Sequence, residues 1–131
     1  MSYIANIFEE TEHNHYFRKV LFTGEKSQLV VMSLKKGEII DKEKHDYVEQ
    51  IFFLLKGTCL ATLDDKEMTM NKGDVIVVSP RTWHEVKNIG DDEALLYTVY
   101  SPANHIDGRV HKTKEEALAD DEDEEFGERP R

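Results

Sequence analysis

Two stretches of the chain carry side chains that could bind one metal ion together. Glu43, His45 and Gln50 lie in the first stretch, and His84 lies in the second. Side chains two residues apart on a strand point to the same face, so Glu43 and His45 project together if their segment is extended. If the strands line one small barrel, the four side chains converge. Two imidazoles, a carboxylate and an amide oxygen suit one divalent transition metal ion, namely Fe, Mn, Ni, Co or Zn.

The two stretches resemble the two sequence motifs of the cupin superfamily. The family motifs are Gly, five residues, His-x-His, three or four residues, Glu, six residues, Gly, and then Gly, five residues, Pro-x-Gly, two residues, His, three residues, Asn. The positions that match in type and spacing are Gly37, His45, Gly57, Gly73, His84 and Asn88. Glu43 stands where the first metal-binding histidine usually sits, and Gln50 stands where the glutamate sits. These two exchanges leave the charge of the ligand set at -1.

The resemblance covers roughly residues 28–102 and is closest to small single-domain cupins labelled mannose-6-phosphate isomerase-like. It implies an all-β fold, the double-stranded β-helix or jelly-roll barrel of cupins. It also implies a metal-dependent enzyme acting on a small-molecule substrate, such as a sugar or sugar-phosphate isomerase or epimerase. Two alternatives stay open, an Fe(II)-dependent dioxygenase and a non-catalytic ligand-binding cupin.

Some neighbouring residues give alternative interpretations. Glu49 offers a carboxylate beside Gln50, and a one-residue shift of register in the loop at 46–48 would exchange the two. Arg81 lies just before His84 in the turn where Ser79 and Arg81 replace the Pro and Gly of the family motif. It could bind a carboxylate or phosphate at the cavity mouth, although a surface position is the simpler interpretation. We interpret the histidines outside the motifs as surface residues, and they are His13, His15, His105 and His111. For His105 and His111 the alternative is that they close over the mouth of the barrel.

Short strands separated by turn signals must position these side chains. Turns recur about every 8–12 residues, which favours a sandwich or barrel over a parallel sheet. The expected strands and extended segments are 16–23, 28–34, 38–47, 50–55, 58–63, 67–70, 75–78, 83–86 and 94–100.

The C-terminal part is the only one with a helical pattern. Thr113 and Glu116 fit a capping box, and the acidic run from Asp120 predicts a disordered tail. We therefore expect a cupin barrel domain over residues 1–112, with its core motifs at 37–88, and a short helix with a loose tail over 113–131.

Composition narrows the classes of partner and compartment. The 131 residues carry a net charge of -10, of which -7 falls on residues 115–131. No basic stripe for nucleic acid is present, and no apolar run approaches the roughly 20 residues of a membrane span. A single cysteine, Cys59, and the absence of a secretory pattern predict a reducing, cytoplasmic location. The outward apolar side chains Ile51, Phe53 and Leu55 predict a homodimer.

Overall fold

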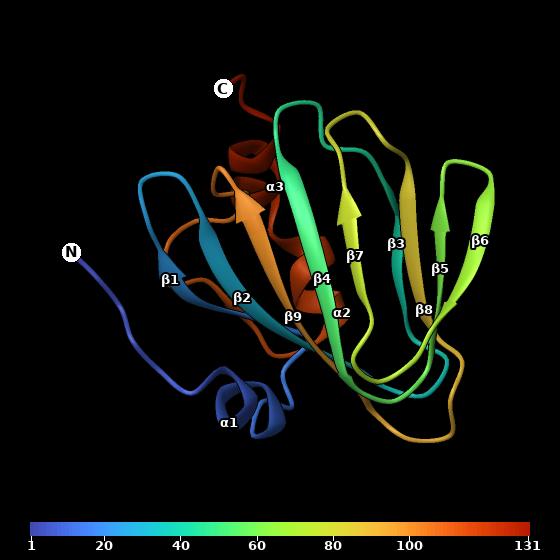
Figure 1. Ribbon diagram of the computed structural model, residues 1–131. Helices are drawn as coiled ribbons and strands as arrows, with labels where there is room; N and C mark the ends of the chain where they lie inside the picture. The colour runs from blue at the N-terminus through green and yellow to red at the C-terminus, as the bar shows by residue number, and fades with distance from the viewer.

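Two antiparallel sheets face each other in the computed structural model, which describes residues 1–131 (Figure 1). The larger sheet has the order β10-β1-β2-β9-β4-β7, and the smaller has the order β3-β8-β5-β6. The strands of the larger sheet are β1 (Arg18–Thr23), β2 (Gln28–Leu34), β4 (Glu49–Lys56), β7 (Val75–Val78), β9 (Ala94–Ser101) and β10 (Val110–His111). Those of the smaller sheet are β3 (Ile39–Glu43), β5 (Cys59–Leu63), β6 (Lys66–Met70) and β8 (His84–Asn88).

Strand alternation sorts the side chains between the inside of the barrel and its outer face. In β4, Phe52 and Leu54 are buried, whereas Ile51 and Phe53 are only partly buried. The inward residues of both sheets form one apolar core, to which Val30, Met32, Leu96 and Val86 also belong. Burial of one face fixes the register of the alternating strands, such as β4 and β7, because a slip by one residue would turn their apolar set outward.

Gly57 shows how tightly the barrel closes after β4. Its φ is +98°, and a Cβ at this position would lie 3.0 Å from Ala94 Cα. Both the left-handed backbone and the close approach to β9 require glycine there. This glycine ends the first motif, so its spacing is tied to the turn that returns the chain from β4 to β5.

The architecture confirms the expected all-β jelly-roll barrel with a C-terminal helix. All nine expected segments contain a strand, with ends shifted by a few residues. Three elements were not expected, namely helix α1 (Ile7–Glu12), the short strand β10 and a second C-terminal helix, α3 (Asp121–Glu128). Helix α1 packs across one end of the larger sheet against β2, β4 and β9 (Figure 1). No helix is long and apolar enough to span a membrane.

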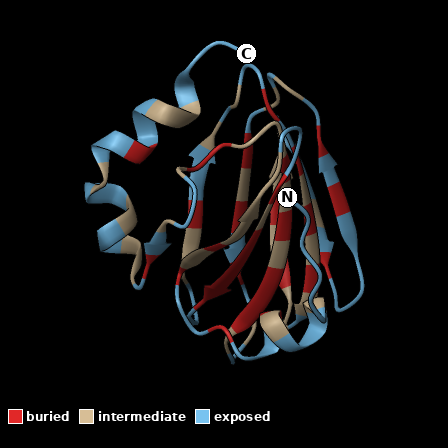
Figure 2. Ribbon diagram, turned by 90° about the vertical axis from the view of Figure 1, so that its left-hand side faces the viewer, coloured by how far each residue is buried: buried red, intermediate tan, exposed pale blue.

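The C-terminal region differs from the expectation of a disordered acidic tail. Thr113 caps α2 (Lys114–Ala119) as the capping box predicts, but a further helix α3 (Asp121–Glu128) follows directly. Figure 2 shows the two helices beside the sheets, with a buried residue on α3. That residue is Asp123, whose carboxylate accepts hydrogen bonds from the loop after β9. Acidic composition alone predicts solvation, but here long-range hydrogen bonds order the segment.

Candidate metal centre

Three of the four expected ligands meet where strands β3 and β8 run side by side. Glu43 ends β3 and pairs with His84 at the start of β8, beyond a bulge in β3. His45 follows two residues after Glu43. Glu43 Oε1 lies 3.4 Å from His45 Nε2 and 3.5 Å from His84 Nε2, and the two imidazole centroids are 5.1 Å apart. The expectation that these side chains converge is therefore met by the geometry.

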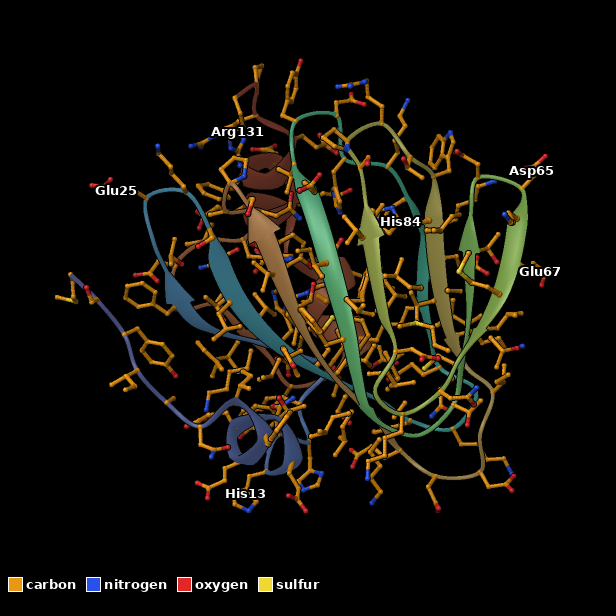
Figure 3. The ribbon with its side chains drawn as sticks, in the orientation of Figure 1. His13, Glu25, Asp65, Glu67, His84 and Arg131 are labelled. Carbon is orange, nitrogen blue, oxygen red and sulfur yellow. The ribbon has the colours of Figure 1, made fainter.

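His84 is the most enclosed member of this group, with 1% of its side chain exposed. Figure 3 shows it on β8, between the two sheets. Its Nδ1 lies 3.0 Å from the backbone carbonyl of Thr82, so Nδ1 carries the proton and donates it. In the neutral ring, Nε2 then presents a lone pair toward Glu43, which is also an acceptor. Two facing acceptors need a shared proton or a metal ion between them, and a histidine whose other nitrogen is fixed by a carbonyl is the usual metal-ligand arrangement.

His45 and Gln50 each add an atom that could bind a metal ion and that has no hydrogen-bond partner in the protein. His45 Nε2 and Gln50 Oε1 are buried and make no hydrogen bond, as is also true of His84 Nε2. Gln50 is oriented by its own amide, because Nε2 donates to Thr98 Oγ1 at 3.1 Å. Glu49 points to the exposed face of β4, so the register selects Gln50 as the inward residue. Unpartnered buried polar atoms are uncommon in folded proteins and call for an explanation.

The charge state of Glu43 fits a cation site. Enclosure of the carboxyl on its own raises the pKa of Glu43, but pairing with His45 and His84 outweighs this and holds the pKa well below its usual range. Glu43 therefore stays ionised at any physiological pH. It would supply the single negative charge of a ligand set in which the histidines bind a metal ion as neutral rings.

A cavity of about 340 Å³ opens beside Glu43 and His45. One wall comes from residues 40–47, and the other comes from α2, α3 and the loop after β9. This volume lies at the lower end of the range for small-molecule sites. The C-terminal segment, for which a short helix and a loose tail were expected, thus forms part of the cavity wall.

The structure shows where Arg81 and the four histidines outside the motifs lie. Arg81 lies outside the cavity, as the surface interpretation predicts, and its side chain donates to the Asp46 carbonyl at 3.3 Å. His105 and His111 are buried, so their interpretation as surface residues is wrong. His13 and His15 are exposed, as expected.

A second cluster joins the barrel to the C-terminal helices. His105 Nδ1 donates to Asp123 at 2.7 Å, and Tyr100 Oη lies 3.1 Å from His105 Nε2. Tyr100 also packs edge-on against the ring of His45, with centroids 6.2 Å apart. The chain Asp123–His105–Tyr100 therefore links helix α3 to a wall of the candidate metal centre. Sequence reasoning missed it because its members lie in three separate elements.

The two facing sheets and the inward cluster of possible metal ligands are typical of a small cupin-fold barrel. Comparison with known proteins supports this class. The Cupin domain family matches residues 30–100, and the chain belongs to this family. An uncharacterized protein of Bacillus subtilis (strain 168), YrkC, is 36% identical over 89% of this chain and 66% of its own length. The chain thus spans just under two thirds of that relative.

Solved structures support the same assignment. The crystal structure of BH2720 from Bacillus halodurans has a TM-score of 0.89 and 32% identity, and it covers 91% of this chain and 95% of that one. A Thermotoga maritima protein described as a predicted oxalate decarboxylase has a TM-score of 0.62 and 21% identity, covering 66% of this chain and 79% of that one. At this identity the second likeness concerns the fold alone.

Proposed function

We propose that the chain is a metal-dependent cupin that acts on a small molecule, with Glu43, His45, Gln50 and His84 holding one divalent transition metal ion. The observation that carries this proposal is that His45 Nε2 and His84 Nε2 are buried without hydrogen-bond partners beside an ionised Glu43, and that the inward Gln50 Oε1 is likewise without one. Leaving these atoms unpaired is unfavourable, and one cation would satisfy all of them. The donor set of imidazoles, carboxylate and amide fits Fe, Mn, Ni, Co or Zn.

The reaction that we favour is an isomerisation or epimerisation of a small polar substrate. A bound divalent ion would supply Lewis-acid polarisation of a substrate oxygen. Three residues of the chain would prepare this centre: Glu43 gives the ligand set its single negative charge, the Thr82 carbonyl holds His84 in one tautomer, and Phe52, at 6.1 Å from the His84 ring, keeps water from its inner side. The cavity of about 340 Å³ limits the substrate to a small molecule.

A second candidate, an Fe(II)-dependent dioxygenase, is favoured by one specific observation. Two histidines and one carboxylate meet at a single point, which is the donor set of non-haem iron oxygenases. Oxygen consumption with Fe(II), but not with Zn(II) or Mn(II), would separate this candidate from the isomerase. A third outcome, metal binding without any turnover, would identify a ligand-binding cupin.

We also propose that two copies associate through the outer face of the larger sheet. Val75 and Val77 on the edge strand β7 are 52% and 54% exposed, and Ile51 and Phe53 lie beside them on β4. An apolar face of this kind at a sheet edge favours association. Val77→Asp should convert a dimer to a monomer in sedimentation velocity experiments, whereas the exposed change Lys66→Asp should leave the dimer intact.

Metal content is the direct test of the proposed function. Protein purified without a histidine tag and analysed by mass spectrometry should hold near one ion per chain, and His84→Ala should hold almost none. Glu85→Gln is the matched control, because Glu85 is the next residue along β8 and its side chain points to the other face. Absence of metal from the wild type, even after incubation with Fe(II), Mn(II), Ni(II) and Zn(II), would overturn the proposal.

A further inference from the structure

Arg18 places a positive charge on the inner face of the barrel. It is the first residue of β1, two residues before the core residue Val20, and it pairs with the buried Met32 of β2. Side chains two apart on a strand share a face, so Arg18 points inward with Val20. Burying a charged guanidinium without a partner is energetically unfavourable, so the groups that surround Arg18 have to be identified.

The partners that the protein gives to Arg18 are too few for its charge. Its Nε is buried and makes no hydrogen bond, and its Nη1 lies 3.5 Å from His111 Nδ1, at the limit of hydrogen bonding. No carboxylate lies within 4.0 Å of it. Arg109, by contrast, makes two bonds to Asp120 and one to Glu122. The guanidinium of Arg18, which lies 5.2 Å from the Phe17 ring centroid, thus has no anionic partner in the protein.

Arg18 lines the same cavity as Glu43 and His45. The walls of that cavity carry six acidic and four basic side chains, which gives -2 in the absence of an ion. With one divalent ion at the metal centre, the charge of the walls would be near zero. Such surroundings accept a singly charged anion at Arg18 more readily than a doubly charged one, and a guanidinium matches the two oxygens of a carboxylate.

We propose that Arg18 binds the carboxylate of the substrate, so that the enzyme acts on a small carboxylic acid that also carries a hydroxyl or carbonyl oxygen. This inference rests on the proposed function, because the second oxygen is the group that the metal centre would take. Arg18 then fixes one end of the molecule while Glu43, His45, Gln50 and His84 define the other. The substrate class is a small hydroxy or keto acid.

The surroundings of Arg18 preserve its role as a free donor. His111 Nε2 lies 2.9 Å from Asp120, so Nε2 carries the proton and Nδ1 can only accept. This contact orients the guanidinium without neutralising it. Asp120 is in turn occupied by Arg109, which keeps its carboxylate away from Arg18. The network therefore holds Arg18 in place and leaves its charge for a ligand.

The test compares lactate with its neutral analogue lactamide, which has the same shape and hydroxyl but no charge. Binding to the Zn(II)-loaded protein is measured by calorimetry or NMR titration, with inorganic phosphate as a third probe. We expect lactate to bind at least tenfold more tightly than lactamide, and phosphate to bind more weakly than lactate. Arg18→Gln should abolish the preference for lactate and keep the metal, while Arg81→Gln, a matched change outside the cavity, should behave as wild type.

A second variant covers the case in which Arg18→Gln does not fold. Arg18→Lys keeps the charge but not the fork, so it should bind lactate several-fold more weakly and still prefer it to lactamide. The inference is overturned if the wild type does not distinguish lactate from lactamide, if Arg18→Gln keeps the distinction, or if phosphate binds best. Metal content measured on the same samples reports separately on the proposed function, since loss of the preference with full metal refutes only the role of Arg18.

Discussion

The chain holds two clusters of histidine and carboxylate side chains that have similar composition but different hydrogen bonds. The first cluster is Glu43, His45 and His84, and the second is His111, Asp120 and Asp123. In each cluster the ligand atoms lie within 4.8 Å of one another. In the first, both Nε2 atoms are without a partner. In the second, Asp120 accepts from Arg109 and His111, and Asp123 accepts from His105 and the Ile106 amide.

This difference teaches that donor type and proximity do not by themselves make a metal site. A metal at the second cluster would have to displace Arg109, whose bonds to Asp120 are 2.7 and 3.1 Å long. At the first cluster nothing has to be displaced, because a cation completes what the protein leaves open. The first cluster is suited to binding, and the second is suited to attaching the C-terminal helices to the barrel.

The largest effect is expected for Glu43→Gln, which tests whether the first cluster binds the metal ion. This change removes the only anionic ligand of the proposed centre, so metal affinity should fall about thousandfold, roughly 4 kcal/mol, since even partners of metal ligands are worth 10–100-fold. Competition with a fluorescent chelator measures this directly. Glu49→Gln is the control, because Glu49 is the exposed carboxylate one residue away from Gln50. An unchanged affinity in Glu43→Gln would place the metal elsewhere.

The next effect tests the second cluster as a structural one. Asp123→Ala leaves the N–H groups of His105 and Ile106 without acceptors at a buried position, so the free energy of unfolding should fall by about 3 kcal/mol. Urea denaturation measures the change. Metal content per folded chain should stay at the wild-type value, and Glu125→Ala, at an exposed position of α3, should change stability by less than about 0.5 kcal/mol. Loss of metal in Asp123→Ala would mean that the two clusters are one functional unit.

Lowering the pH should have a smaller effect on the free energy of unfolding, and this effect acts through His105. Burial is the main cause that lowers the pKa of His105 to about 4, with the Arg18 charge adding to it and Asp123 opposing both. The neutral ring is therefore the folded form, and between pH 6.5 and 4 the unfolded chain binds the extra proton. Stability must then fall as the pH drops through this window, by about 2 kcal/mol between pH 6.5 and 4.5 from this one group.

Comparison with a variant isolates the contribution of His105 from that of the other titrating groups. His105→Gln has no proton to gain, so its stability deficit relative to the wild type should shrink as the pH falls from 6.5 to 4.5. The exposed change His13→Gln should run parallel to the wild type over the same range. A deficit that stays constant for His105→Gln would show that the pKa of His105 is the same in the folded and the unfolded chain.

The sequence allowed the first cluster to be predicted because its members lie within two local patterns. Glu43 and His45 are two residues apart, His84 has a fixed spacing from Gly73 and Asn88, and strand alternation does the rest. Gly57 illustrates the same point, since its backbone and its contact with Ala94 both demand glycine at that distance from β4. Turn spacing thus predicted an all-β fold, and the resemblance to the two cupin motifs predicted the barrel and pointed to the candidate ligands.

The second cluster could not be predicted because its partners are far apart in the chain. Asp123 meets His105 across 18 residues, and no spacing rule connects a helix at the C-terminus to a loop after β9. The acidic run predicted solvation, which holds for most of its carboxylates but not for Asp123. The inward position of Arg18 could have been predicted, because alternation with Val20 in the expected strand 16–23 places it inside the barrel.

The smallest effect sharpens the comparison by moving α3 without touching any carboxylate. A Cβ on Gly127 would lie 2.8 Å from the backbone oxygen of Asn104 and 2.9 Å from its Oδ1, so Gly127→Ala must push the helix away from the loop after β9. Alanine by itself favours a helix by about 1 kcal/mol over glycine, and the clash outweighs this gain because a backbone atom cannot move aside easily. The free energy of unfolding should fall by about 1 kcal/mol, seen by urea denaturation and as faster hydrogen exchange in α3.

Glu125→Ala is again the control for the helix itself, and metal affinity should be unchanged in Gly127→Ala. A gain in stability would mean that α3 already lies free of the loop, and that the cavity wall it forms is open rather than fixed.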